Sequence, residues 1–336
     1  MKLKKEYLIL LLMIIVLSAY LMMRSRNQTH YELPSPAQAD SQKIDRIVIT
    51  KNGQGFELNK KDDQWTVGPE AYAADSVKVK NMVKAAVDLS ITDLISESGN
   101  YERYDLTDDK KIDVQVFEGG KMVRNFSVGK AAPTYQHTFV RLADDPKVYN
   151  ARGQLNHTFD HTISNLRDLM VLAFDKDAIT DVTIRKGEQS LTLAKKEIAP
   201  EKKPQSSDNP KEEEKKDAGA LPQPKAQPQW QGPDGKPADQ PAVQRLLNDF
   251  SEFKCNAYMA DDAAKDLKAK TPRWTLTFKA GEENHSLSVF DPADSKATEF
   301  PALSSSEPYA FTINKSREEG IEKTIDKLLI QKQDAK

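Results

Sequence analysis

Two histidines, His157 and His161, lie four residues apart in the segment HTFDH. On a helix this spacing places both imidazoles on one face, which is the arrangement that a pair of zinc ligands requires. The metalloprotease pattern has glutamate directly after the first histidine, whereas this chain has Thr158 there. Because no third ligand is recognisable, the pattern favours two histidines on a partly exposed helix face over a metal site.

The other groups that could do chemistry stand alone in the sequence. Cys255 is the single cysteine, so an intrachain disulfide and a multi-cysteine metal site are excluded, and a small buried residue is the favoured interpretation. There is no glycine-rich phosphate loop and no serine in a nucleophile elbow. Lysine and arginine total 49 against 51 aspartates and glutamates, which gives no basic face for nucleic acid. We therefore expect no catalytic residues, no metal, no cofactor and no nucleic-acid partner.

Two tryptophans, Trp65 and Trp230, are weak candidates for a ligand-binding surface. They occupy equivalent positions in the internal repeat described next, so one interpretation is an aromatic platform for a ligand. The interpretation that we favour is a pair of equivalent core anchors, because large aromatic side chains dominate core burial.

These residues are positioned by a strand pattern that occurs twice. Residues 44–61 and 179–196 align without a gap, and apolar and polar residues alternate in both copies. Such alternation is typical of a strand with one buried face. Each copy is therefore predicted to form two short strands joined by a turn, at residues 52–53 or 186–187.

The order of elements after each copy is also the same. A tryptophan strand and a Gly-Pro pair lead to an aspartate, Asp75 or Asp239, which we expect to cap an amphipathic helix. Further strand patterns follow in both halves. The fold class is predicted to be α+β, with two tandem repeats of antiparallel strands and one or two helices each, over residues 43–175 and 176–336.

A helix is predicted to close each repeat. Leu155, Phe159, Ile163 and Leu166 recur at helical spacing in the segment before Asp175, and the C-terminal segment shows the same pattern. A stretch over 198–228, rich in Pro, Lys, Glu and Ala, has no counterpart in the first repeat. It is predicted to be a disordered loop inserted into the hairpin before the second tryptophan strand.

The N-terminus indicates location. Residues 1–26 are predicted to form a short cytoplasmic stub and a transmembrane anchor, because an uncharged apolar run extends from Tyr7 to Met23. As a helix this run spans about 25 Å, near the lower limit for crossing a bilayer core. Three preceding lysines favour an inside N-terminus, although two arginines follow the run. A cleaved signal peptide is the alternative, and bulky residues at the end of the run disfavour it. Residues 27–42 are predicted to be a tether.

The combined pattern resembles the domain-of-unknown-function family DUF4340. The motifs that carry the resemblance are Ile44, Ile47 and Ile49, then Trp65, Ala74-Asp75, Tyr104-Asp105-Leu106, and the run 166–175. The resemblance implies a membrane-anchored extracytoplasmic protein of the kind that accompanies permease and auxiliary subunits of export-type ABC transporters, including gliding-motility-like systems. It implies no catalytic residues.

We therefore expect a non-enzymatic accessory or scaffold protein in a bacterial inner membrane, with its bulk in the periplasm and transporter subunits as partners. The alternative is a module that binds an envelope polymer, a polysaccharide or peptidoglycan, through an exposed aromatic groove between the repeats. A hydrolase is a third possibility, and it requires a constellation of catalytic groups that the sequence does not show.

Overall fold

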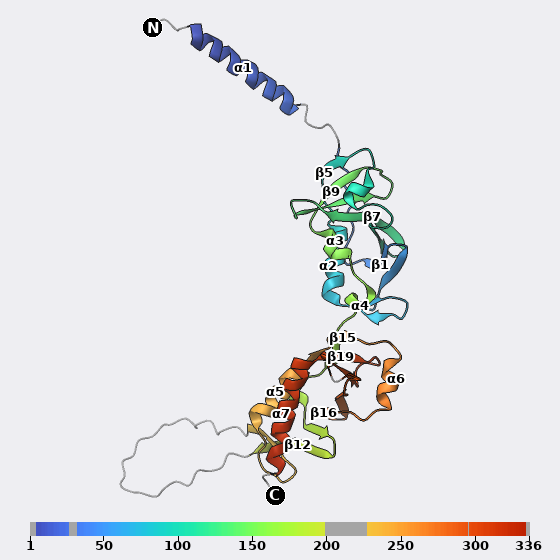
Figure 1. Cartoon of the computed structure of the whole chain (residues 1–336), viewed down its shortest axis with the longest axis vertical. Helices are drawn as coiled ribbons and strands as arrows, with labels where there is room; N and C mark the ends of the chain where they lie inside the picture. The colour runs from blue at the N-terminus through green and yellow to red at the C-terminus, as the bar shows by residue number, and fades with distance from the viewer. Residues whose placement is uncertain (1–4, 27–31, 199–226, 295, 334–336) are drawn as a thin grey trace, which may run out of the picture. The chain divides into compact units, whose positions relative to one another are not determined.

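The computed structural model describes residues 5–26, 32–198, 227–294 and 296–333. The chain divides into two compact units, Met1–Asp168 and Leu169–Lys336, and each contains one large antiparallel sheet with helices (Figure 1). The predicted α+β class is confirmed. Most of the predicted insertion, residues 199–226, lies outside the described residues, as do residues 1–4 of the stub and 27–31 of the tether.

The sheet of the first unit has nine strands within the described residues. Their order across the sheet is β4-β3-β2-β1-β6-β7-β8-β9-β5. Their bounds are β1 (Ile44–Lys51), β2 (Gln54–Lys61), β3 (Gln64–Val67), β4 (Tyr72–Ala73), β5 (Ile91–Ser96), β6 (Ile112–Glu118), β7 (Lys121–Ala131), β8 (His137–Leu142) and β9 (Val148–Arg152). A short 3-10 helix, η1 (Tyr101–Tyr104), lies between β5 and β6.

The sheet of the second unit has eight strands in the part that the structure describes. Their order is β13-β12-β11-β16-β17-β18-β19-β15. Their bounds are β11 (Asp181–Lys186), β12 (Gln189–Ile198), β13 (Gln227–Gln231), β15 (Ala257–Tyr258), β16 (Trp274–Ala280), β17 (Glu283–Val289), β18 (Glu299–Ser304) and β19 (Phe311–Asn314). The helices α5 (Gln240–Phe250), α6 (Ala263–Lys268) and α7 (Lys315–Gln333) belong to the same unit.

The two sheets share one topology. Apart from β4, each strand of the first sheet has a counterpart at the same place in the second. The registers also correspond, because Ile47 faces Val116 in the first sheet while Val182 faces Phe278 in the second. The apolar residues that alternate in the sequence are those that fill the two cores. The repeat that the sequence predicts is therefore present in the hydrogen-bonded ladders.

The helix after the tryptophan strand forms in both units as predicted. In the first unit α2 spans Ser76–Val87, and the Asp75 carboxylate accepts hydrogen bonds from the amides of Val77 and Lys78. In the second unit the Asp239 carboxylate accepts from the amide of Ala242. These caps satisfy amides that the first turn leaves unpaired. The apolar stripe of each helix is buried in its core; its members are Val79, Met82, Val83 and Ala86 in α2, and Val243, Leu246, Leu247 and Phe250 in α5.

The helix predicted before Asp175 is not continuous. It forms two short helices, α3 (Leu155–Phe159) and α4 (Ile163–Leu166), and the side chain of Thr162 caps the second by accepting from the amide of Asn165. In the second unit α7 runs unbroken over Lys315–Gln333.

The boundary between the units falls seven residues before the predicted one. A strand that the sequence analysis did not predict, β10 (Met170–Ala173), pairs with β14 (Glu252–Lys254), which follows α5 in the second unit. The pairing ties the segment after Asp168 to the second sheet, so the first unit ends there.

The N-terminal run is helical as α1 (Lys5–Arg26). Within the part of the chain that the structure describes, no helix is long and apolar enough to cross a membrane. The side chains of Tyr7 and Met23, which mark the ends of the predicted anchor, lie outside the described side chains.

A network of charged side chains holds α7 on the second sheet. Arg273 donates to both carboxylate oxygens of Glu322, at 2.8 and 2.7 Å, and Lys186 lies 2.9 Å from the same carboxylate. One turn earlier, Glu318 is only 1% exposed and accepts a hydrogen bond of 3.0 Å from the indole nitrogen of Trp274. Two glutamates of one helix are therefore in different environments.

We expect these two glutamates to give opposite dependences of stability on pH. Burial raises the pKa of Glu318 above its ordinary 4.5, so its contribution to stability is largest below 4.5 and falls as pH rises through the folded value. Burial also raises the pKa of Glu322, but the hydrogen bonds from Arg273 and Lys186 outweigh it and lower the pKa, so this contribution is lost as pH falls below 4.5. Urea denaturation between about pH 3 and about pH 7 tests this. The free energy of unfolding of wild type minus that of Glu318→Gln should fall with rising pH. The free energy of unfolding of wild type minus that of Glu322→Gln should rise with rising pH. The same pH dependence for both variants would contradict the assignment.

Candidate functional site

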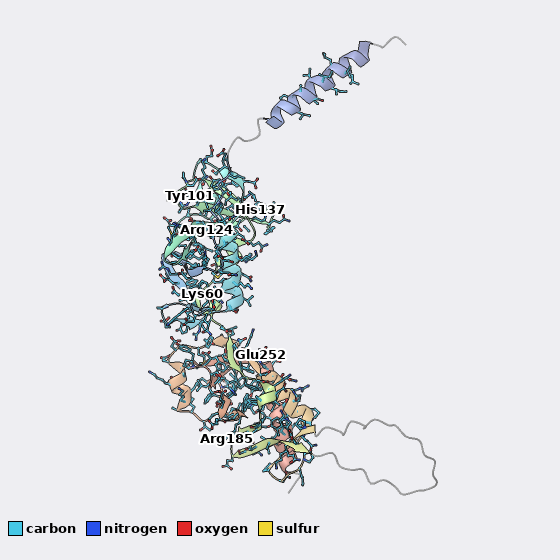
Figure 2. The ribbon with its side chains drawn as sticks, turned by 180° about the vertical axis from the view of Figure 1, so that it is seen from behind. Lys60, Tyr101, Arg124, His137, Arg185 and Glu252 are labelled. Carbon is cyan, nitrogen blue, oxygen red and sulfur yellow. The ribbon has the colours of Figure 1, made fainter. Side chains whose placement is uncertain are left out.

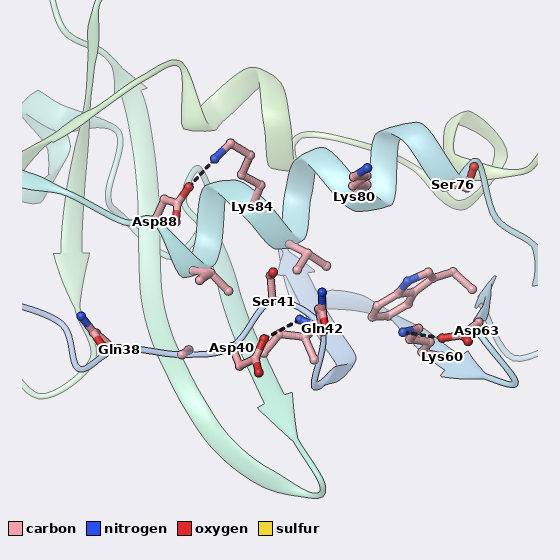
Figure 3. A pocket seen from close by; sticks show the side chains of 15 residues that line it. Gln38, Asp40, Ser41, Gln42, Lys60, Asp63, Ser76, Lys80, Lys84 and Asp88 are labelled. Carbon is pink, nitrogen blue, oxygen red and sulfur yellow. Dashed lines mark hydrogen bonds and ion pairs between the residues drawn. The ribbon is translucent and has the colours of Figure 1, made fainter.

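A cleft of about 920 Å³ opens in the first unit between α2, the β2–β3 hairpin and the segment 38–42 (Figure 3). We call it the Trp65 cleft. Its lining residues are Gln38, Ala39, Asp40, Ser41, Gln42, Ile44, Lys60, Asp63, Trp65, Ser76, Lys80, Val83, Lys84, Val87 and Asp88.

The polar stripe of α2 forms one wall. Ser76, Lys80, Lys84 and Asp88 follow one another at intervals of four, which places them along one side of the helix. Lys84 donates to the Asp88 carboxylate at 2.5 Å. Lys80 is exposed, and among the described residues its ammonium has no hydrogen-bond or ion-pair partner. A free cation therefore stands near the middle of this wall.

The β2–β3 hairpin forms the opposite wall. Lys60 lies 2.9 Å from the Asp63 carboxylate, and this hydrogen bond holds the pKa of Asp63 below its usual range. Trp65 is the cross-strand partner of Lys60. It packs against the core and is partly exposed to the cleft. The wall thus offers an aromatic ring beside a paired cation.

The third wall is the segment that the sequence predicts to be the end of a tether. The Asp40 carboxylate accepts from the amide of Gln42 at 3.0 Å, which fixes a turn there. Arg124, which Figure 2 labels, holds the chain just before this turn by donating to the carbonyl of Ala37. Residues 37–42 of the predicted tether therefore contact the first unit.

Arg124 also donates hydrogen bonds to the backbone carbonyls at the end of α2. Its Nε and Nη2 donate to the carbonyls of Ala86 and Val87, both at 3.2 Å, and its Nη1 donates to the carbonyl of Val123 at 2.8 Å. The last carbonyls of a helix lack intrahelical partners and carry its negative dipole end. Burial lowers the pKa of this guanidinium, which is 6% exposed. One side chain thus joins the helix, the sheet and the third wall.

The two histidines do not share a helix face, which corrects the prediction. His157 lies exposed on α3, whereas His161 lies in the break before α4, because α3 ends at Phe159. Burial lowers the pKa of His161, and the charge of nearby Lys78 adds to the effect. In the described ranges no group of three His, Cys, Asp or Glu side chains is placed to hold a metal ion.

The two tryptophans differ in environment. Trp230 is 5% exposed and lies in the core of the second unit, so it has no free ring face for a ligand. Trp65 lines the cleft. The two residues therefore do not form a common platform, and the candidate site has one of them.

Sequence reasoning missed Lys80, Lys84 and Arg124. A signal for the lysines was present, because the equivalent positions of the second helix, counted from the two capping aspartates, are Gln244 and Asn248. Arg124 gave no such signal, since its partners are backbone carbonyls from three separate segments.

No curated protein and no solved structure matches the chain. The family model described as "Domain of unknown function (DUF4340)" matches residues 65–222. The match begins at Trp65 in β3 and continues past Asp168 into the second unit. Residues 65–222 are therefore a DUF4340 domain, and the resemblance predicted from the sequence is confirmed.

Proposed function

We propose that the protein is a non-enzymatic accessory protein of a bacterial inner membrane, held by the N-terminal apolar run from Tyr7 to Met23 as a single-pass anchor with both sheet units outside the cytoplasm. The side chains of α1 are described only over residues 10–21, a stretch shorter than a membrane span, so the length of the anchor is taken from the sequence of the whole run. The observation that carries the proposal is the apolar surface of α1. Its large apolar side chains between Leu10 and Leu21 are each 55–65% exposed. A helix that is apolar on all sides requires an apolar environment, which a bilayer supplies.

The proposed orientation comes from charge. Lys2, Lys4 and Lys5 precede the apolar run, and lysines next to a span favour the cytoplasmic side. The non-enzymatic role is supported by the sequence, in which no nucleophile, base and orienting group stand at a recognised spacing. Transporter subunits of the export or gliding-motility-like type are the proposed partners, on the strength of the family resemblance.

The anchor is tested by cell fractionation. Replacing Leu12 and Ile15 together by arginine should move the protein out of the membrane pellet, because charges at the centre of a span disfavour insertion. Met122→Arg is the matched control, since it adds a charge at an exposed apolar residue of the sheet unit and should leave the protein in the pellet. Equal retention of both variants in the pellet after carbonate washing would reject the anchor.

The orientation is tested by thiol labelling of intact spheroplasts. The natural Cys255 is buried, so it should give little background. Lys121→Cys, exposed at the start of β7 in the first unit, should react with a membrane-impermeant maleimide from outside. Lys4→Cys should react only after permeabilisation. The reverse labelling pattern would show the opposite membrane topology and would contradict the proposed location of the sheet units.

The partner is tested by purification in mild detergent from native membranes. The expected result is co-purification of transporter permease and ATPase subunits with the wild-type protein and with Met122→Arg, and their loss with the double-arginine variant. Recovery of the protein alone, under conditions that keep a known membrane complex intact, would contradict the proposed association with transporter subunits.

A further inference from the structure

The turn that borders the Trp65 cleft has a counterpart in the second repeat. Asp40 caps a turn ahead of β1, and Asp175 caps the same turn ahead of β11 by accepting from the amide of Asp177 at 2.9 Å. In the second unit this turn is tied to its surroundings. Lys176 donates to the Asn248 side chain of α5 at 3.0 Å, and Lys195 of β12 donates to the carbonyl of Asp177 at 3.0 Å.

The first repeat has different side chains at the tying positions. Ser41 stands in place of Lys176, and Lys84 in place of Asn248, so no lysine–amide bridge forms there. Lys84 instead pairs with Asp88 on its own helix. Lys80 replaces Gln244 and adds a second cation. The cleft is therefore a local difference between two copies of one fold.

The cleft is lined by three carboxylates and three lysines, and two of each are paired with one another: Asp63 with Lys60 and Asp88 with Lys84. Asp40 accepts from the amide of Gln42.

The remaining groups point to one ligand chemistry. Trp65 presents part of an indole ring, and Lys80 presents an ammonium without a described partner. The side chains of Gln38, Ser41 and Gln42 line the same space, and none of them forms a side-chain hydrogen bond with another described residue. A space of about 920 Å³ accommodates more than one ring.

A sugar ring matches this set of groups. Its C–H face is apolar and packs against an indole, while its hydroxyls donate to and accept from amides and hydroxyls. A carboxylate on the sugar would form a charge-assisted hydrogen bond with a lysine. A peptide strand would instead need the unpaired backbone of a sheet edge or an apolar pocket. The α2 wall offers a polar stripe.

We propose that the Trp65 cleft binds an acidic saccharide, with a sugar ring packed on Trp65 and its carboxylate on the Lys80 ammonium. This assigns a site and a ligand class to the alternative of envelope-polymer binding. This proposal is independent of the membrane anchor and of any transporter partner, because its test measures ligand binding to the purified protein.

The test is calorimetric titration of the full-length protein in detergent with tetragalacturonate. Cellotetraose is the neutral control and tetraglutamate the acidic peptide control. Tetragalacturonate should bind most tightly, and its affinity should fall as salt is raised, because the cleft is open to solvent. Lys80→Gln, which installs the residue of the second repeat, should weaken binding about tenfold. Trp65→Ala should remove binding.

Two controls keep the test decisive. Lys121→Gln removes an exposed lysine that does not line the cleft and should leave the affinity unchanged. Far-ultraviolet circular dichroism should show that every variant is folded. Intrinsic fluorescence provides a second readout, because Trp230 and Trp274 are buried and Trp65 should report the ligand. The proposal is overturned if tetragalacturonate gives no binding, if cellotetraose or tetraglutamate binds as tightly, or if Lys80→Gln binds like wild type.

Discussion

Replacing Arg124 by methionine is expected to destabilise the first unit by about 3 kcal/mol, the cost of removing a buried charged donor from its partners. The side chain is 6% exposed and donates to four backbone carbonyls. Methionine fills a similar length but donates nothing, so the carbonyls of Ala86 and Val87 at the end of α2 lose their partner. Buried carbonyls without partners carry the full cost of lost hydration.

Hydrogen exchange of the full chain, followed by mass spectrometry, localises this effect. Protection should fall in α2 and in the sheet of the first unit, while the second unit keeps its wild-type protection. Lys121→Met, an exposed change on the same strand, should alter stability by less than about 0.5 kcal/mol. Unchanged protection in α2 of Arg124→Met would show that the guanidinium contributes nothing there.

The Arg124→Met variant should also lower the affinity of the Trp65 cleft for its ligand. Arg124 ties Ala37 to the helix, and residues 38–42 that follow form the third wall. Loss of this tie increases the conformational freedom that a ligand must restrict on binding.

Replacing Arg273 by methionine is expected to cost the second unit about 3 kcal/mol, because it leaves the buried Glu318 carboxylate without its cation and leaves Glu322 with Lys186 alone. Glu322 loses a bidentate partner, and Glu318 loses a guanidinium nitrogen at 3.2 Å while it remains 1% exposed. Hydrogen bonding to Glu322 is the main reason that the pKa of Arg273 is raised. The charge of the network thus favours attachment of α7 to the sheet.

Urea denaturation in a Trp65→Phe background measures this effect, since the remaining Trp230 and Trp274 both report on the second unit. Adding Glu318→Gln to Arg273→Met should recover part of the loss, because the neutral amide keeps an acceptor for the Trp274 indole without a buried charge. Lys327→Met removes an exposed ion pair with Asp239 and should cost less than about 1 kcal/mol. Equal losses for Arg273→Met and Lys327→Met would contradict the network.

Much of the fold could be predicted because its signals are local. Alternation of apolar residues predicts the strands of 44–61 and 179–196, and a carboxylate at Asp75 or Asp239 predicts the helix start. These patterns act over a few residues, so a single sequence reveals them. Their order, seen twice, predicted two tandem α+β repeats.

The missed elements depend on contacts between distant segments. The helical period through Leu155 and Leu166 is real, yet the chain breaks after Phe159, where the capping side chain of Thr162 starts a new turn. The boundary at Asp168 rests on the pairing of β10 with β14, which are about eighty residues apart in sequence and too short for a periodic signal.

The sequence by itself determined the α+β class, the repeat, the helix caps and the DUF4340 resemblance, because each rests on residue type and spacing. Only the tertiary structure decided which tryptophan stays buried and which borders a cleft. In the second unit, a hydrogen bond between Lys176 and Asn248 ties the turn before the first strand to the neighbouring helix. In the first unit, the equivalent turn and the Lys80 side of the helix line the cleft. Such ties join side chains far apart in the chain, and their geometry exists only once the sheet and helix have packed.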